Sequence, residues 1–98
     1  TNVWREWRND SNFAAPQGES LNQVQQRVAD ACTELAQRLD GRTAVVVSHV
    51  SPIKSAVAWA LGVDVSVGWK TQLATASITR LAISANGAAL ASFNEVAR

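Results

Sequence analysis

Val45-Val46-Val47-Ser48-His49 is the stretch of sequence that decides the fold of this chain. The run over residues 43–48 is short, apolar and β-branched without polar alternation, which is typical of a strand covered on both faces of a parallel sheet. Ser51-Pro52 then indicates a helix N-cap followed by proline at the first helical position. The stretch therefore predicts a central buried strand that delivers His49 to a strand-to-helix junction.

A long amphipathic helix is predicted before this strand. Ser20 and Gln23 form a Ser-x-x-Gln capping box, in which each side chain satisfies a backbone donor at the helix start. Gly41 is placed to end the helix near Asp40 in the left-handed conformation. Apolar residues recur at intervals of three and four and predict one buried stripe: Leu21, Val24, Val28, Cys32, Leu35 and Leu39.

The remaining segments give one more helix and a hairpin. The helix after Pro52 has Ile53, Val57, Ala60 and Leu61 on its inner face and ends at Gly62. Residues 77–83 and 88–93 are predicted strands, joined by a turn at Asn86-Gly87. Between Gly62 and these strands the pattern is weak, with Trp69 as the expected anchor. Residues 1–20 indicate a short helical turn and then a loop, because Pro16 and Gly18 interrupt periodic structure.

Together these elements predict an α/β fold in one domain over residues 1–98, a helix-strand-helix unit followed by a β-hairpin with a small mixed sheet. The formal charge of +1 has no run of one sign, so the composition does not favour nucleic acid or an anionic membrane. No apolar run is long enough for a membrane helix, and the amino terminus does not resemble a signal peptide. The single cysteine, Cys32, excludes an internal disulfide and fits a reducing cytoplasm.

His49 is the only histidine, and its position suggests a binding site. In open α/β sheets, ligands bind beyond the carboxyl ends of the strands, and the free N–H groups of the following helix favour an anion. An imidazole there can donate to a phosphate oxygen or protonate a leaving group. The alternative is a histidine whose nitrogens are satisfied by backbone, and position alone leaves both interpretations open.

Three segments of the chain, one of which contains His49, resemble motifs of a known family and occur in the order in which that family has them. Residues 45–54, Val-Val-Val-Ser-His-Val-Ser-Pro-Ile-Lys, resemble the second-histidine motif of the histidine phosphatase superfamily, the phosphoglycerate mutase-like enzymes. Residues 16–21 are similar to the family's Pro-Gly-Gly-Glu-Ser-Leu segment, and Arg27-Val28 lies where its helix carries Arg-Val. Residues 76–79 and 93–95 are similar to the closing strands of its small acid phosphatases. The amino-acid sequence of the histidine motif looks most like that of actinobacterial phosphatase domains, some of which follow a ribonuclease H domain.

The resemblance implies a phosphomonoesterase without a cofactor or metal, in which one histidine attacks the phosphate and forms a phosphohistidine that water hydrolyses. His49 would be the second active-site histidine. Val50 and Ser51 would contact the phosphate, with Ser48 and Glu19 as possible supporting residues. The family's nucleophile lies in an Arg-His-Gly motif, which this sequence lacks.

We therefore expect the carboxy-terminal half of a phosphatase domain, inactive alone. Its expected partners are a phosphate monoester and either the missing amino-terminal half or a second copy of the chain. The alternatives are a non-catalytic α/β interaction or regulatory module, and half of a phosphoglycerate mutase.

Several candidate residues also have structural interpretations. Val50 could simply pack, Ser51 could cap the helix, and Glu19 could complement the helix dipole. Lys54 could steer anions, although a solvated lysine is the more common case. Three aromatic residues, Trp4, Trp7 and Phe13, could line a substrate pocket or anchor a core. Cys32 fits a small core residue.

Overall fold

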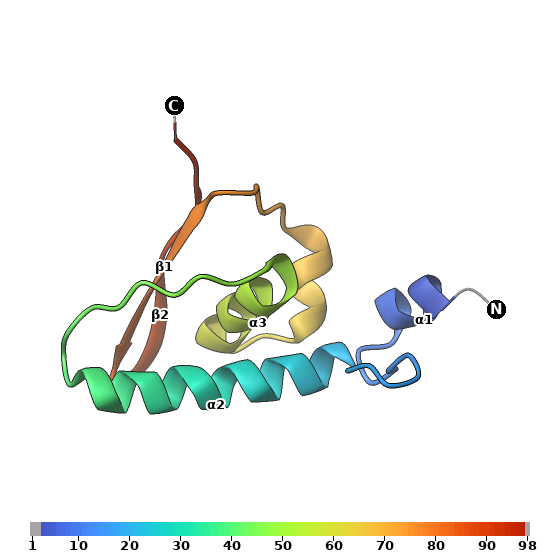
Figure 1. Cartoon of the computed structure of the whole chain (residues 1–98), viewed down its shortest axis with the longest axis horizontal. Helices are drawn as coiled ribbons and strands as arrows, with labels where there is room; N and C mark the ends of the chain where they lie inside the picture. The colour runs from blue at the N-terminus through green and yellow to red at the C-terminus, as the bar shows by residue number, and fades with distance from the viewer. Residues whose placement is uncertain (1–2, 98) are drawn as a thin grey trace.

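The computed structural model describes residues 3–97, which form a group of helices with a hairpin beside them (Figure 1). The elements are α1 (Val3–Asn9), α2 (Leu21–Leu39), α3 (Val50–Leu61), the 3₁₀ helix η1 (Val65–Lys70), β1 (Ile78–Ser84) and β2 (Gly87–Glu95). In Figure 1, α3 lies over the middle of α2, the hairpin stands near the C-terminal end of α2 and α1 lies beyond its N-terminal end. None of the described helices is long and apolar enough to cross a membrane.

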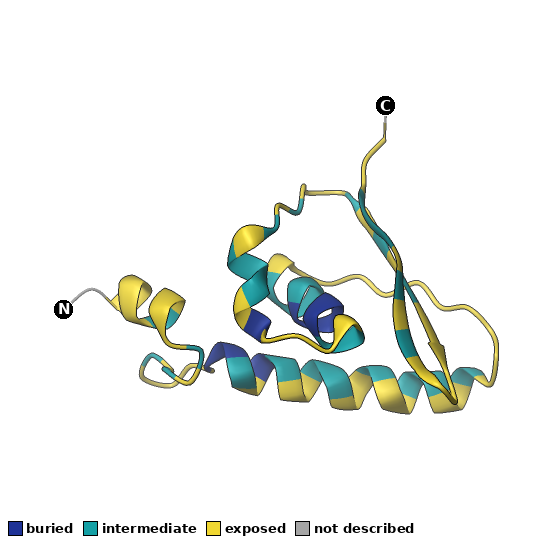
Figure 2. Ribbon diagram, turned by 180° about the vertical axis from the view of Figure 1, so that it is seen from behind, coloured by how far each residue is buried: buried dark blue, intermediate teal, exposed yellow. Residues whose placement is uncertain are grey.

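The predicted capping box starts α2. The Ser20 hydroxyl accepts from the Gln23 N–H at 3.1 Å, and the Gln23 side chain accepts from the Ser20 N–H at 2.8 Å. At the other end, Asp40 takes the left-handed conformation (φ 46°) and Gly41 follows with φ 85°. The apolar stripe is fully buried only at Leu21 and Val24, and Figure 2 shows burial falling off along the rest of α2.

The start of α3 differs from the prediction. His49, with extended backbone (φ −127°, ψ 171°), is the N-cap, and its side chain makes no capping hydrogen bond. Ser51 and Pro52 lie inside the first turn, so the prediction that Ser51 caps the helix is wrong. Pro52 is tolerated because N–H groups of the first turn have no partner within the helix. Gly62 ends α3 with φ 70°, as predicted.

The core is built around α3. Four consecutive residues, Ser55 to Ala58, are buried, which requires cover on all sides of the helix. That cover comes from α2, η1 and the hairpin, each of which contacts α3. Val65 of η1 is only 4% exposed and closes one side. η1 lies in the segment whose sequence pattern was too weak to predict an element.

The predicted hairpin is present as a two-stranded antiparallel sheet. Its turn is Ala85-Asn86, one residue earlier than predicted, and Ser84 pairs with Gly87. Gly87 alone takes positive φ (121°) there, whereas Asn86 does not. The strand prediction is therefore confirmed, while the placement of the turn at Asn86-Gly87 is wrong.

The predicted central strand is not formed within this chain. Residues 42–49 have no regular secondary structure, and the side chains of Val45, Val46 and Val47 are 91%, 67% and 93% exposed. Figure 1 shows the segment as a long connection from the end of α2 to the start of α3. A strand needs neighbouring strands for its backbone hydrogen bonds, and among residues 3–97 the only sheet is the β1–β2 hairpin. The predicted mixed sheet is correspondingly two-stranded and antiparallel here.

Candidate active site

Residues 42–49 form a valine-rich connection between α2 and α3. His49 is exposed at the end of this connection, where α3 begins. Its carbonyl oxygen accepts from the Ile53 N–H at 3.1 Å, which closes the first turn of the helix. Within residues 3–97, its imidazole makes no capping hydrogen bond to the helix. The ring is therefore held at a helix N-terminus by its backbone while its nitrogens remain open to a ligand.

Two backbone donors lie beside this histidine. Pro52 has no N–H and the Ile53 N–H is used, so the free donors of the first turn belong to Val50 and Ser51. Neither N–H is hydrogen-bonded within the part of the chain that the structure describes. Together with the positive end of the helix dipole, these donors favour an anion at this point. Both residues were predicted as phosphate contacts, and the structure places them next to His49.

A small cavity of about 50 Å³ opens against the first turns of α3. It is lined by residues of α2, α3 and η1: Leu21, Val50, Ser51, Lys54, Ser55, Val65, Gly68 and Trp69. Ser55 is 1% exposed, and its hydroxyl has no hydrogen-bond partner among the described residues; the indole N–H of Trp69 is likewise buried without one. This end of α3 thus contains unsatisfied polar atoms, which favour a bound polar group.

Lys54 donates to backbone carbonyls and does not extend into solvent. Its ammonium group donates to the carbonyl oxygens of Gly68 at 2.9 Å and Thr71 at 2.6 Å. These carbonyls are at the C-terminal end of η1, where a positive charge is stabilising. The prediction of a solvated lysine is wrong, and its role is to attach η1 to α3.

Glu19 is paired with Arg27. The guanidinium donates to both carboxylate oxygens at 3.0 Å, and these hydrogen bonds hold the pKa of Glu19 below its ordinary value. The two family motifs that contain these residues therefore meet in one exposed ion pair. Ser48, the other possible supporting residue, is exposed in the valine-rich connection.

The sequence did not predict that the tryptophans cluster. Trp4 and Trp7 of α1 pack edge-on against Trp69 of η1, with ring centroids 6.0 and 5.2 Å apart. The Arg8 guanidinium lies over the rings of Trp4 and Trp69, at 5.5 and 5.3 Å from their centroids. The sequence signals were the spacing of Trp4 and Trp7 on one helix face and Trp69 as an anchor. Phe13, half-buried in the following loop, has no ring contact of this kind among the described residues.

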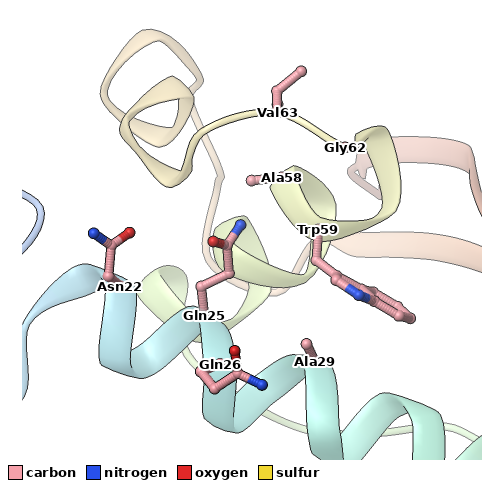
Figure 3. Close-up of a pocket in the computed structure, with 8 residues that line it drawn as sticks. All are labelled: Asn22, Gln25, Gln26, Ala29, Ala58, Trp59, Gly62 and Val63. Carbon is pink, nitrogen blue, oxygen red and sulfur yellow. The ribbon is translucent and has the colours of Figure 1, made fainter.

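A larger cavity of about 430 Å³ lies elsewhere, between α2 and the C-terminal end of α3 (Figure 3). Its lining consists of carboxamides and apolar groups: Asn22, Gln25, Gln26, Ala29, Ala58, Trp59, Gly62 and Val63. None of these side chains titrates, so this cavity offers no acid or base. His49 and the first turn of α3 are therefore the better candidate for chemistry.

Metal ligation has no support in the described part of the chain. Residues 3–97 contain no group of three or more His, Cys, Asp or Glu side chains that could hold an ion. Cys32 is half-buried on the apolar stripe of α2, and burial raises the pKa of its thiol. A raised pKa disfavours the thiolate, which agrees with a packing role for Cys32.

Comparison with known proteins decides the family. The model of the histidine phosphatase superfamily, branch 1, matches residues 1–96. The chain belongs to the histidine phosphatase superfamily. An uncharacterised protein of Mycobacterium bovis and a bifunctional protein of Mycobacterium tuberculosis are each 34% identical to it over 84 residues. That match covers 86% of this chain but 23% of each relative, so the chain spans less than a quarter of their length.

A solved structure shows the same fold. A mutant phosphoserine phosphatase from Entamoeba histolytica, crystallised with phosphoserine, superimposes with a TM-score of 0.80 at 23% identity. The match covers 94% of this chain and 48% of that one. The fold predicted from the sequence motifs is thereby confirmed as part of a histidine phosphatase fold, and this chain spans about half of that neighbour.

Proposed function

We propose that the chain is part of a phosphomonoesterase of the acid phosphatase type and supplies its second active-site histidine, His49. The observation that carries the proposal is the position of His49 at the N-cap of α3, next to the free N–H groups of Val50 and Ser51. An imidazole and two backbone donors there suit a phosphoryl group. Membership of the histidine phosphatase superfamily supports this assignment.

In the proposed reaction, Val50 and Ser51 donate to phosphoryl oxygens, and His49 donates a further hydrogen bond as negative charge builds up. A histidine outside this chain attacks phosphorus, the bond to the substrate alcohol breaks, and an acidic side chain outside this chain protonates the departing alcohol oxygen. Water then gives a proton back to that carboxylate and attacks the phosphohistidine, which releases inorganic phosphate and restores the histidine. No metal or cofactor takes part in these steps.

The site requires a second part of the protein, because the Arg-His-Gly nucleophile motif does not occur in this sequence. We propose that the amino-terminal half of the domain supplies it and pairs with residues 43–48, which then form a buried strand. The exposure of three consecutive valines supports this, since a continuous apolar run suits a strand with both faces covered. The 98-residue chain alone is then inactive.

The complete protein would be an actinobacterial type of phosphatase, in some members of which a ribonuclease H domain comes first. The identity to mycobacterial proteins supports the actinobacterial placement. A cytoplasmic location fits the single, unpaired Cys32.

A second candidate is a non-catalytic module that binds another chain through its exposed valines. The observation in its favour is the same exposed run, which can add a strand to a partner's sheet edge. A phosphoglycerate mutase half is a variant of the first proposal, in which the phosphoryl group returns to a second alcohol instead of water.

The test is hydrolysis of p-nitrophenyl phosphate by the complete polypeptide that contains this chain. His49→Ala is expected to lower kcat/KM by about 10²- to 10³-fold, the range for losing one donor that stabilises developing negative charge. The matched control is Thr33→Ala on the exposed face of α2, which should leave the rate unchanged. Full activity of His49→Ala would overturn the assignment, and His49-dependent hydrolysis by the 98-residue chain alone would overturn the two-part site.

A further inference from the structure

Arg8 is held at the surface by two indole rings. Its guanidinium carbon lies 5.5 Å from the ring centroid of Trp4 and 5.3 Å from that of Trp69, within the range of cation–π attraction. Trp4 is 57% exposed, so the cluster opens to solvent. The two rings fix the position of a side chain that is otherwise among the most mobile, because both contact the same planar group.

This packing leaves the hydrogen-bond donors of Arg8 available. Contacts with aromatic rings use the guanidinium charge and its faces, whereas its five N–H groups point outward in the guanidinium plane. Within residues 3–97, Arg8 makes no hydrogen bond and no ion pair, in contrast to Arg27, Arg38 and Arg80, each of which binds a glutamate. A fixed, unpaired guanidinium fork matches a carboxylate or a phosphate group.

Trp69 is next to Arg8 and also to the N-terminal end of α3, where the phosphate site is proposed. The same indole that contacts Arg8 lines the small cavity together with Val50 and Ser51. The buried hydroxyl of Ser55, which lacks a partner among the described residues, lines that cavity too. Two features that favour anions are therefore both next to the same tryptophan.

We infer that Arg8, clamped by Trp4 and Trp69, recognises a second anionic group on the substrate. The substrates are then phosphomonoesters whose alcohol carries a carboxylate or another phosphate. Arg8 is a specificity residue and takes no part in bond making or breaking. This inference rests on the proposed function, because it places the first phosphate at Val50 and Ser51.

The test compares ligands that differ only in the second anion. O-phosphoserine is paired with O-phosphoethanolamine, which lacks the carboxylate, and fructose 1,6-bisphosphate with fructose 6-phosphate. Binding to the complete polypeptide is measured by titration calorimetry in a His49→Ala background, which slows turnover. In at least one pair, the doubly anionic ligand is expected to bind about 10- to 100-fold more tightly, as for a hydrogen-bonded charge pair.

Arg8→Gln is expected to remove that preference and leave the affinity for the singly anionic ligand unchanged. Arg8→Lys, which keeps the charge but loses the planar fork, should retain only part of it. Arg38→Gln, the same charge change on the exposed face of α2, is the control and should keep the preference.

Equal binding within both pairs, or a preference that survives Arg8→Gln, would overturn the inference. These outcomes are distinct from failure of the proposed function, in which inorganic phosphate does not bind and p-nitrophenyl phosphate is not hydrolysed by the unmodified protein.

Discussion

The valine-rich connection and α3 are neighbouring segments of similar apolar character with opposite environments. Val57 in α3 is 4% exposed, whereas Val46 in the connection is 67% exposed. α3 satisfies its backbone internally and is covered by α2, η1 and the hairpin. The connection needs strands on either side, and no strand of residues 3–97 pairs with it. The difference shows that an apolar run is buried only where other segments are present to cover it.

The largest expected effect is that of a substitution at Val46, which tests this contrast. In the complete polypeptide, Val46→Asp would bury an unpaired carboxylate in the proposed sheet and cost about 3 kcal/mol or more of unfolding free energy. In the 98-residue chain the same change should stay within about 0.5 kcal/mol, because Val46 is solvated there. Urea unfolding of both proteins measures the difference. An equally small effect in both would contradict a buried strand.

A core change in α3 should act in the 98-residue chain itself. Val57→Ala removes two methyl groups from a buried position and is expected to cost about 2 kcal/mol, from lost burial plus the cavity left behind. Val63→Ala, at a 44% exposed position after α3, is the control and should stay within about 0.5 kcal/mol. Urea midpoints separate the two variants, and equal losses would show that α3 is not the core.

The cap of α2 should contribute less. Ser20→Ala removes the acceptor for the Gln23 N–H and is expected to cost about 1 kcal/mol. Thr33→Ala, on the exposed face of the same helix, is the matched control for loss of a hydroxyl. Thermal unfolding of the two variants measures the difference. A Ser20→Ala variant as stable as the control would contradict a stabilising role for the capping box.

The smallest effect concerns the exposed ion pair of Glu19 and Arg27. Hydrogen bonds from Arg27 lower the pKa of Glu19 in the folded chain, so their stabilisation is present above the unfolded pKa and is lost as pH falls through the folded pKa. Arg27→Gln should raise the pKa of Glu19 towards its ordinary value, as followed by NMR titration of the carboxyl. Arg38→Gln should leave it unchanged, and an unaltered Glu19 pKa in Arg27→Gln would contradict this pairing.

The features predicted from sequence were those that depend on nearby residues. The capping box at Ser20, the end of α3 at Gly62 and the β1–β2 hairpin all rest on interactions over a few positions. The strand at residues 43–48 was wrong for this chain because its pairing depends on distant segments. The first turn of α3 was misplaced because Pro52 is acceptable at more than one early helical position.

For the candidate site, the sequence indicated the position of His49, Val50 and Ser51 at a helix N-terminus. It could not indicate that Lys54 binds the carbonyls of η1, because η1 itself has no clear periodicity. The contact of Arg8 with Trp69 joins residues 61 positions apart in the chain, and local patterns carry no signal for such a pair.

The account's central claim is that the valine-rich connection becomes a paired strand beside the site of His49. Amide hydrogen exchange at Val45, Val46 and Val47 tests it most directly, in the 98-residue chain and in the complete polypeptide. The account predicts fast exchange at all three amides in the chain alone and strong protection of the paired amides in the complete polypeptide. Fast exchange at all three in both proteins would contradict it.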